Sequence, residues 1–542
     1  MTRKTFLRMS AASLSLSKAL VGQVSARPSS AAQAGDLRHV LDPEAFRHHV
    51  ETFNAMGPEE VVNLIPDAQA WEWMKRNVPL FTCPDRDLEQ IYYFRWWTYR
   101  KSIKTTPEGI IVTEFLKPVK HAAEYNALSC AYGHHVAEGR WLHDRRFIEE
   151  DTHFWLCTGE NGGLRENFHQ FSGWAAAALY DRWLADGDLK ALVRYLDLLI
   201  LDYAAWEIER LTDSGLFWQR DVSDGMESSI SGGRKVKNIR PSINSYMYGN
   251  LKAIAAIADL AGRHIIAGEY RVKAAYLKGL IQRLLWNKQD GFFETRVESG
   301  EFAPVRESIG FTPWYFDLPD DRAGYEVAWK QLMDPQGFYA PYGPTTAERR
   351  SPDFQIPYEG DDCQWNGPSW PFATTITLRA LANVLNGYHQ TAVGKDAWFR
   401  TFQIYTRSQH LKLDDGLVIP WIDEDLNPLT GEWLARAMKI RKKTFYGRGD
   451  HYNHSGYADL VITGLAGLRP RSGNVVEVNP LVPAGTWDWF CLDRVPYHGH
   501  IVTVVWDKTG ARFGKGKGLR LFADGREIAR SPELTRISGT IG

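Results

Sequence analysis

The sequence has few cysteines, little net charge and no long apolar run. Its five cysteines are scattered and form no Cys-x-x-Cys motif, which argues against a zinc cage or a dense disulfide framework. A net charge of −1 provides no basic field for nucleic acid or an anionic membrane surface. No segment after the N-terminal region reaches the roughly 18 apolar residues of a membrane span. We therefore expect no metal site, no cofactor, no nucleic-acid partner and no membrane span.

Aromatic residues, by contrast, are abundant. They make up 13% of the 542 residues and include 21 Trp. Two interpretations are open: a large aromatic core, or a cleft lined by rings that stack on the apolar faces of sugars. Hydrophobic residues reach 44%, which is enough for a large packed core. The length accommodates one large domain with a smaller one, or three ordinary domains.

The first 34 residues have the composition of an export signal. Basic residues come first, a mildly apolar stretch follows, and small residues precede possible cleavage sites near Ala26 and Ala34. The segment 2–8 (Thr-Arg-Lys-Thr-Phe-Leu-Arg) resembles a twin-arginine signal in which Lys4 replaces the second arginine. We therefore expect residues 1–34 to be an export leader and the protein to be periplasmic or secreted.

After the leader, apolar residues recur at helical spacing in pairs of segments. The pairs, followed by a last single segment, are 169–188 with 189–211, 242–263 with 268–286, 372–387 with 394–411, and 457–468. Long polar, aromatic and Gly/Pro-rich segments separate them, and loops of that length are usually functional. The pattern predicts a toroid of helical hairpins whose loops build a site at one end. A helical solenoid is the alternative, although no short repeat is visible.

The pattern changes near Asn474. From there apolar and polar residues alternate around Gly and Asp turns, which is typical of β-strands. The sequence therefore predicts a mainly α protein with a helical catalytic domain over residues 35–470 and a small C-terminal β domain over residues 471–542.

Acidic and aromatic residues gather in loops between the predicted helices. The loops 215–233, 357–372, 422–433 and 445–457 hold most of them. Glycoside cleavage needs one protonated carboxylic acid to donate to the leaving oxygen, and a second carboxylate to attack or to activate water. Aromatic faces and polar side chains then hold the sugar ring. The clustering therefore indicates a carbohydrate-cleaving site.

Three of these loop segments resemble motifs of one enzyme family. Residues 225–229 (Gly-Met-Glu-Ser-Ser) are similar to the Gly-(Met/Trp)-Asp-x-Ser segment of the trehalase and processing α-glucosidase I group, which includes bacterial mannosylglycerate hydrolases and glycoside hydrolase family 63. Residues 365–371 (Trp-Asn-Gly-Pro-Ser-Trp-Pro) resemble its Trp-Arg-Gly-Pro-x-Trp-Pro segment, and residues 450–453 (Asp-His-Tyr-Asn) stand where that group has Glu-x-Tyr. The resemblance extends over roughly residues 85–468.

The resemblance implies an (α/α)6 toroid and an inverting hydrolase that cleaves an α-linked bond without a cofactor. Glu227 takes the position of the family's acid, an Asp, and Asp450 that of its base, a Glu. Glu227 is one methylene longer than the family's Asp, and Asp450 is one methylene shorter than its Glu. The distance between the two carboxyl groups could therefore be preserved. Asp224 is a rival acid, and Glu359 and Asp361 are rival bases.

A carbohydrate substrate is the expected partner. The side chains expected to hold it are Trp218, Arg220, Asn244, Tyr246, Trp365, Asn366, Trp370 and Tyr452. Asn366 replaces the family's usual arginine.

Other functions use the same toroid. A polysaccharide lyase would need a Tyr or His base and a cation for the uronate, for which His169, Tyr246 and Arg240 are available. A sugar epimerase would use two histidines. A glycan-binding protein would keep the tryptophans and need no acid pair.

Overall fold

The computed structural model describes residues 39–356 and 363–542. The predicted export leader, 1–34, lies outside the described residues, as do the rival bases Glu359 and Asp361. No helix in the described part of the chain is both long and apolar enough to span a bilayer.

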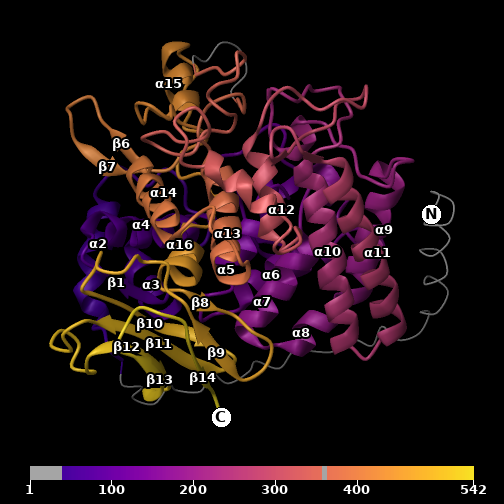
Figure 1. Ribbon diagram of the computed structural model, residues 1–542. Helices are drawn as coiled ribbons and strands as arrows, with labels where there is room; N and C mark the ends of the chain where they lie inside the picture. The colour runs from indigo at the N-terminus through magenta and orange to yellow at the C-terminus, as the bar shows by residue number, and fades with distance from the viewer. Residues whose placement is uncertain (1–38, 357–362) are drawn as a thin grey trace.

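An inner ring of helices organises the molecule (Figure 1). Its members contact one another in a closed cycle and are α5 (Tyr132–Gly139), α7 (Ala175–Asp186), α10 (Pro241–Leu260), α12 (Thr312–Tyr315), α13 (Pro371–Gly387) and α16 (Tyr457–Leu460). Outer helices pack against this ring, and they include α4 (Arg86–Ser102), α6 (Arg146–Cys157), α9 (Leu196–Arg210), α11 (His264–Leu284) and α14 (Lys395–Ser408). This is the (α/α)6 toroid that the sequence predicted.

Shorter elements complete the helical part. The remaining helices are α2 (Arg47–Asn54), α3 (Ala70–Asn77), α8 (Leu189–Val193) and α15 (Leu434–Arg441). Small hairpins are formed by β2 (Ile103–Thr106) with β3 (Gly109–Val112), β4 (Trp286–Asn287) with β5 (Phe292–Phe293), and β6 (His410–Lys412) with β7 (Val418–Pro420).

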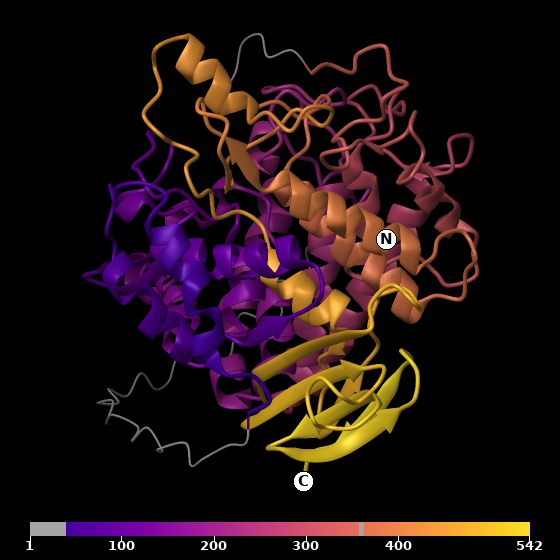
Figure 2. The same ribbon diagram turned by 90° about the vertical axis from the view of Figure 1, so that its left-hand side faces the viewer.

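The inner helices begin at the same end of the ring. Pro241 and Pro371 occupy the first positions of α10 and α13, where proline costs no hydrogen bond and presets the helical φ. Near these starts, the ring of Trp174 lies 4.9 Å from that of Tyr246 and 6.2 Å from that of Phe372. The long loops therefore converge above the N-terminal ends of the inner helices, opposite the C-terminal sheet (Figure 2).

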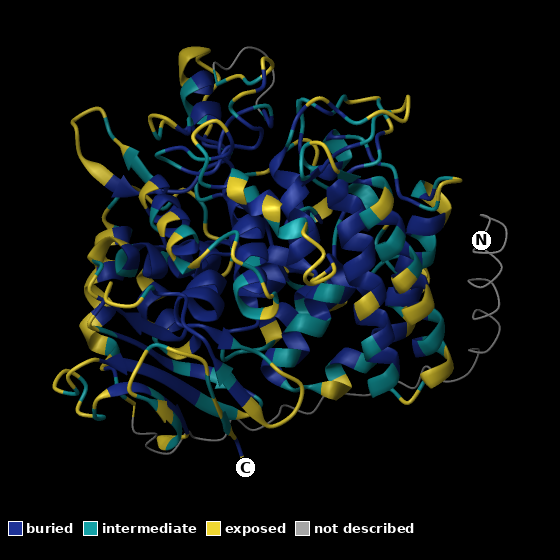
Figure 3. Ribbon diagram, in the orientation of Figure 1, coloured by how far each residue is buried: buried dark blue, intermediate teal, exposed yellow. Residues whose placement is uncertain are grey.

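Most of the aromatic residues serve the core. The largest fully buried side chains include Trp96, Trp141, Trp155, Trp174, Trp314, Trp329, Trp398 and Trp433. Burial is densest in the inner ring (Figure 3), because an inner helix is covered both by its neighbours in the ring and by the outer layer. The high tryptophan content thus reflects the core more than a sugar cleft.

The C-terminal sheet is antiparallel, in the order β1-β10-β11-β12-β13. Its strands are β1 (Leu80–Thr82), β10 (Trp489–Tyr497), β11 (His500–Asp507), β12 (Gly518–Ala523) and β13 (Arg526–Ser531). A smaller sheet, β14-β9-β8, joins Ile537–Thr540, Val475–Val478 and Leu468–Arg469. The mainly helical architecture with a C-terminal β sheet agrees with the predicted fold class. Strands β1 and β8 come from the range predicted to be helical, and the boundary at 470/471 stays a prediction.

Candidate active site

The loop between α9 and α10 carries Glu227 and is folded tightly against the ring. A single helical turn, Val222–Asp224, ends at Gly225, whose φ of 70° is left-handed. Ser228, directly after Glu227, also has a left-handed φ, of 58°, which costs a residue with a side chain about 1 kcal/mol or more. The carbonyl of Glu227 accepts a hydrogen bond from the Trp365 N–H at 3.0 Å. Strain and a cross-loop hydrogen bond therefore fix the position of this acid.

The carboxyl group of Glu227 is half-buried and adapted to hold a proton. Burial raises the pKa of Glu227 to about 7; the negative charges of Asp221 and Glu424 act in the same direction, and the cation of Arg234 opposes them. A carboxylic acid that stays protonated near neutral pH is the form that general-acid catalysis requires.

Glu424 supplies a second carboxylate, whose charge acts on Glu227. It lies in the loop 422–433 and is 2% exposed. The Arg448 guanidinium donates to both of its oxygens, with Nε 2.7 Å from Oε1, and the Sγ of Cys363 lies 3.6 Å from Oε2. Its charge is therefore balanced by a bidentate arginine. Glu227 and Glu424 thus form a pair of carboxyl groups in contrasting surroundings, as acid/base chemistry needs.

Glu114 adds a further buried carboxyl to this group. It accepts a hydrogen bond from the Tyr452 hydroxyl, and its main chain binds the N–H of Asn453 at 2.9 Å. Burial raises the pKa of Glu114 to about 7, and the charges of Glu227 and Glu424 add to the shift. Glu114 therefore ties the loop that holds Tyr452 to the acidic cluster.

Asp450, the predicted base, lies at the side of this cluster. It faces a cavity of about 230 Å³ between the N-terminal helices and the loop 445–457. Its Oδ1 is 2.5 Å from Nη1 of Arg436. Burial raises the pKa of Asp450, whereas Arg436 and Lys117 lower it. The charge of Glu424 reaches Glu227, whereas Asp450 lines a separate cavity. The role of Asp450 as the base stays a prediction.

Asp224, the rival acid, is already paired. Its Oδ2 accepts hydrogen bonds from Nε of Arg240 at 2.9 Å and from the Ser242 hydroxyl. All three side chains are buried. This ion pair holds the loop 215–233, called the acidic loop below, to the start of α10. It leaves Glu227 as the better-placed proton donor.

Comparison with known families identifies the helical part of the chain. Residues 124–455 match the mannosylglycerate hydrolase MGH1-like glycoside hydrolase domain, which is more than half of the chain. The chain belongs to this family. Residues 468–530 also match the C-terminal domain of glycosyl hydrolase family 65. The resemblance predicted from the loop motifs is thereby confirmed.

Solved structures show relatives of this MGH1-like chain. A protein titled sialidase is 46% identical with a TM-score of 0.87, over 92% of this chain and 45% of that one. A GH78 family rhamnosidase of Bacillus sp. GL1 is 12% identical with a TM-score of 0.56, over 82% and 41% of the two chains. The α-L-rhamnosidase of Dictyoglumus thermophilum is 13% identical with a TM-score of 0.51, over 80% and 43%. The rhamnosidases share the fold, and the present chain spans less than half of each of these relatives.

Two stacked tryptophans border the acids in this MGH1-like site. The rings of Trp365 and Trp370 lie 4.8 Å apart with an interplanar angle of 14°, and Nε1 of Trp370 donates to the Gln364 carbonyl at 2.8 Å. Both side chains are buried. Asn366 is half-buried, and its main-chain carbonyl accepts the N–H of Gln355 at 3.0 Å. Trp365, whose N–H binds the Glu227 carbonyl, connects this segment to the acidic loop.

Other predicted binding residues have structural partners. The Asn244 side chain bonds the N–H and the carbonyl of Phe217, each at 2.8 Å. Tyr246 is buried against Trp174. Both therefore brace the ring beneath the site.

Trp218 and Arg220 lie on the outer part of the acidic loop. Trp218 is half-buried between the cations of Arg210 and Lys237, 4.6 Å and 4.7 Å from its ring centroid. Arg220 is also half-buried. Their role in holding sugar stays a prediction.

The residues of the lyase alternative are dispersed. His169 pairs with Asp202 at 2.7 Å and stacks on Trp206 of the outer helix α9. Arg240 is committed to Asp224. The geometry therefore gives these residues no common substrate position. Within residues 39–356 and 363–542, no group of three or more His, Cys, Asp or Glu side chains is arranged to hold a metal ion.

Sequence reasoning missed Glu114 and named no residue of the loop 422–433. Glu114 follows the β2–β3 hairpin as a single acid with no motif around it. The signal available in the sequence was the run of three consecutive acids Asp423, Glu424 and Asp425. The structure buries all three, which is rare for acids without partners.

Proposed function

We propose that the protein hydrolyses a glycosidic bond with inversion, with Glu227 as general acid and Glu424 as general base. The observation that carries the proposal is the pairing of a carboxyl group whose pKa is raised to about 7 with a carboxylate balanced by Arg448. Membership of a glycoside hydrolase family supports the reaction class.

In this mechanism Glu227 gives its proton to the glycosidic oxygen as the bond to the anomeric carbon breaks. Glu424 takes a proton from a water molecule, whose oxygen forms the new bond on the opposite face. One water is consumed, and the two carboxyl groups exchange their protonation states until solvent restores them. The Trp365–Trp370 pair and Asn366 would border the sugar. The family resemblance favours an α-linked bond.

A sialoside is a second candidate substrate, because the relative with 46% identity is titled sialidase. Some sialidases use a tyrosine nucleophile, and Tyr452 is hydrogen-bonded to Glu114 here. Burial, however, raises the pKa of Tyr452, which opposes formation of the phenolate. An acid/base pair acting through water is therefore the better-supported mechanism for either substrate.

The test is proton NMR of the product anomer on a panel of α-mannosides, α-glucosides, α-rhamnosides and sialosides. Glu227→Gln and Glu424→Gln should each lower kcat by about 10²-fold or more, and Asp450→Asn should lower it less. Retention of configuration would contradict the mechanism. An inactive Asp450→Asn beside an active Glu424→Gln would return the base to Asp450, and glycan binding without turnover would identify a binding protein.

We further propose that the chain is exported, on the strength of its basic, then apolar, then small-residue N-terminal segment. Cell fractionation with N-terminal sequencing tests this, and an uncleaved cytoplasmic product would contradict it.

A further inference from the structure

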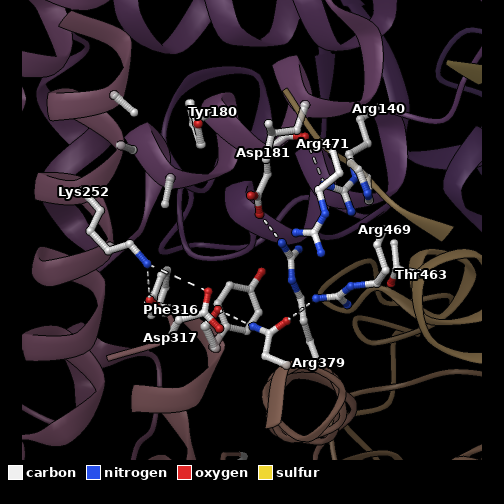
Figure 4. A pocket seen from close by; sticks show the side chains of 18 residues that line it. Arg140, Tyr180, Asp181, Lys252, Phe316, Asp317, Arg379, Thr463, Arg469 and Arg471 are labelled. Atoms are coloured by element: carbon white, nitrogen blue, oxygen red, sulfur yellow. Dashed lines mark hydrogen bonds and ion pairs between the residues drawn. The ribbon is translucent and has the colours of Figure 1, made fainter. Parts of the chain in front are cut away.

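A second cavity lies at the end of the toroid away from the acidic loops. It has a volume of about 300 Å³ and is lined by residues of α7, α10 and α13 together with Arg140 after α5 and Arg469 in β8. Figure 4 shows side chains from these elements pointing toward a common space. The cavity therefore sits where the inner ring meets the smaller sheet, β14-β9-β8, and nothing in the proposed hydrolysis uses it.

The lining of this cavity is rich in charged side chains, with a small excess of cations. Its cationic side chains are Arg140, Lys252, Arg379, Arg469 and Arg471. Four of them have a carboxylate within ion-pair distance. The pairs are Arg140 with Asp459, Lys252 with Asp317, Arg379 with Asp181, and Arg471 with Glu477. The cavity thus holds one more cation than it has carboxylate partners.

The unmatched cation is Arg469. Its Nη2 donates to Oδ1 of Asn383 at 3.0 Å, and among the described residues no carboxylate oxygen lies within 4.0 Å of its guanidinium. Burial lowers the pKa of Arg469 to about 10, and repulsion from Arg471 and Arg379 adds to the shift. The charges of Asp317 and Glu477 oppose it. Arg469 is half-buried, and a partly desolvated guanidinium without a carboxylate partner is stabilised by an anion that reaches it.

We propose that this cavity binds a small oxyanion, a phosphate, sulfate or carboxylate group, seated on the guanidinium of Arg469. A planar guanidinium matches two oxygens of such a group. Arg379 and Arg471 lie on the same side of the cavity, and Lys252 approaches from α10 (Figure 4). The volume admits either a free ion or a small organic molecule that carries the group.

The position of Arg469 gives the binding a structural consequence. Arg469 belongs to β8, whereas its partner Asn383 belongs to α13. An anion bound here would hold the inner helices to the smaller sheet, β14-β9-β8. It should therefore raise the melting temperature of the full chain and leave kcat unchanged, since the acidic loops lie at the other end.

Isothermal titration calorimetry and thermal melting of the full chain test the proposal. The probes are inorganic phosphate, sulfate and citrate, each compared with sodium chloride at equal ionic strength. Saturable binding and a rise in melting temperature beyond that of chloride are expected. Arg469→Gln should weaken binding by about tenfold or more, whereas Arg530→Gln, at a side chain 70% exposed on β13, should not.

A second variant separates a binding site from a merely structural arginine. Asp317→Asn removes the carboxylate bordering Lys252 and should tighten anion binding about two- to fivefold, the range of an exposed ion pair. Binding of phosphate and sulfate without citrate would identify a free inorganic ion, and binding of citrate alone a carboxylate-bearing molecule. Responses no greater than chloride for every probe, or equal binding by wild type and Arg469→Gln, would overturn the proposal.

Discussion

At the scale of single residues, the chemistry depends on the proton of Glu227. Because the pKa of this carboxyl is raised to about 7, the acid form is lost as the pH rises through that value. We expect kcat/KM to fall on the alkaline side with a midpoint near pH 7. The profile should be measured from about pH 5 to about pH 9.

A substrate with a better leaving group provides the control. A glycosyl fluoride needs little proton donation, so Glu227→Gln should retain far more activity on it than on a natural glycoside. Equal losses on both substrates would mean that Glu227 is not the acid.

Individual acids could be recognised from sequence only where a motif surrounded them. Glu227 stands in the segment 225–229, whose resemblance to a family motif identified the loop, and its role as the acid stays a prediction. The proximity of Glu424 and Glu114 depends on loops separated by hundreds of residues, so no local pattern contains it. The pairing of Asp224 with Arg240 likewise appears only in three dimensions.

At the scale of elements, Gly225 is the residue that lets the acidic loop turn. Its φ is 70°, and a Cβ there would lie 2.6 Å from Sγ of Cys130. Gly225→Ala should therefore cost about 1–2 kcal/mol for the left-handed backbone, with a further cost for the contact. Gly300→Ala, with φ 90° and no atom within 4 Å of the added Cβ, should show the backbone cost alone.

Denaturant unfolding of both glycine variants measures the difference. Adding Cys130→Ala to Gly225→Ala should restore the part of the unfolding free energy that is lost through the contact with Sγ of Cys130. Equal destabilisation by the two glycine substitutions would show that Cys130 does not confine the loop.

Asn244 connects the same loop to α10. Asn244→Ala would leave the buried N–H and carbonyl of Phe217 without a partner and should cost about 2–4 kcal/mol, with a lower kcat. Asn250→Ala is the matched control, since Asn250 on the same helix bonds the Ala177 N–H at 3.3 Å and the Gly173 carbonyl at 3.2 Å. Steady-state kinetics should show reduced kcat in the first variant only, and a similar loss in both would contradict the role of the loop.

The elements themselves followed closely from the sequence. Apolar residues at helical spacing predicted the segments that form α7, α10, α13 and α16. The four-residue helix α12 lies outside every predicted segment. Strand β1 could not be predicted, because three residues acquire a strand conformation there only through pairing with β10.

At the scale of the whole molecule, buried carboxyl groups couple stability to pH. The pKa of Glu114 is about 7 in the folded state against an ordinary value of 4.5. Between these values the folded state binds more protons than the unfolded one, so this group lowers the free energy of unfolding as the pH rises. We expect Glu114→Gln to make that decline shallower between about pH 5 and about pH 8.

Thermal or chemical unfolding across this pH range, with the exposed Glu301→Gln as control, measures the effect. If the free energy of unfolding falls as steeply with pH in Glu114→Gln as in wild type, groups other than Glu114 determine the pH dependence of stability.

The pairing of Leu80 with Asp493 determines when the molecule can be completed during synthesis. A ribosome adds roughly 5–20 residues each second, so β1 emerges tens of seconds before its partner strand exists. During that interval β1, whose three residues are all buried in the folded protein, has no strand to pair with. A chain that stopped before Trp489 would lack this partner altogether, so the N-terminal region waits for some of the last strands to be made before it is complete.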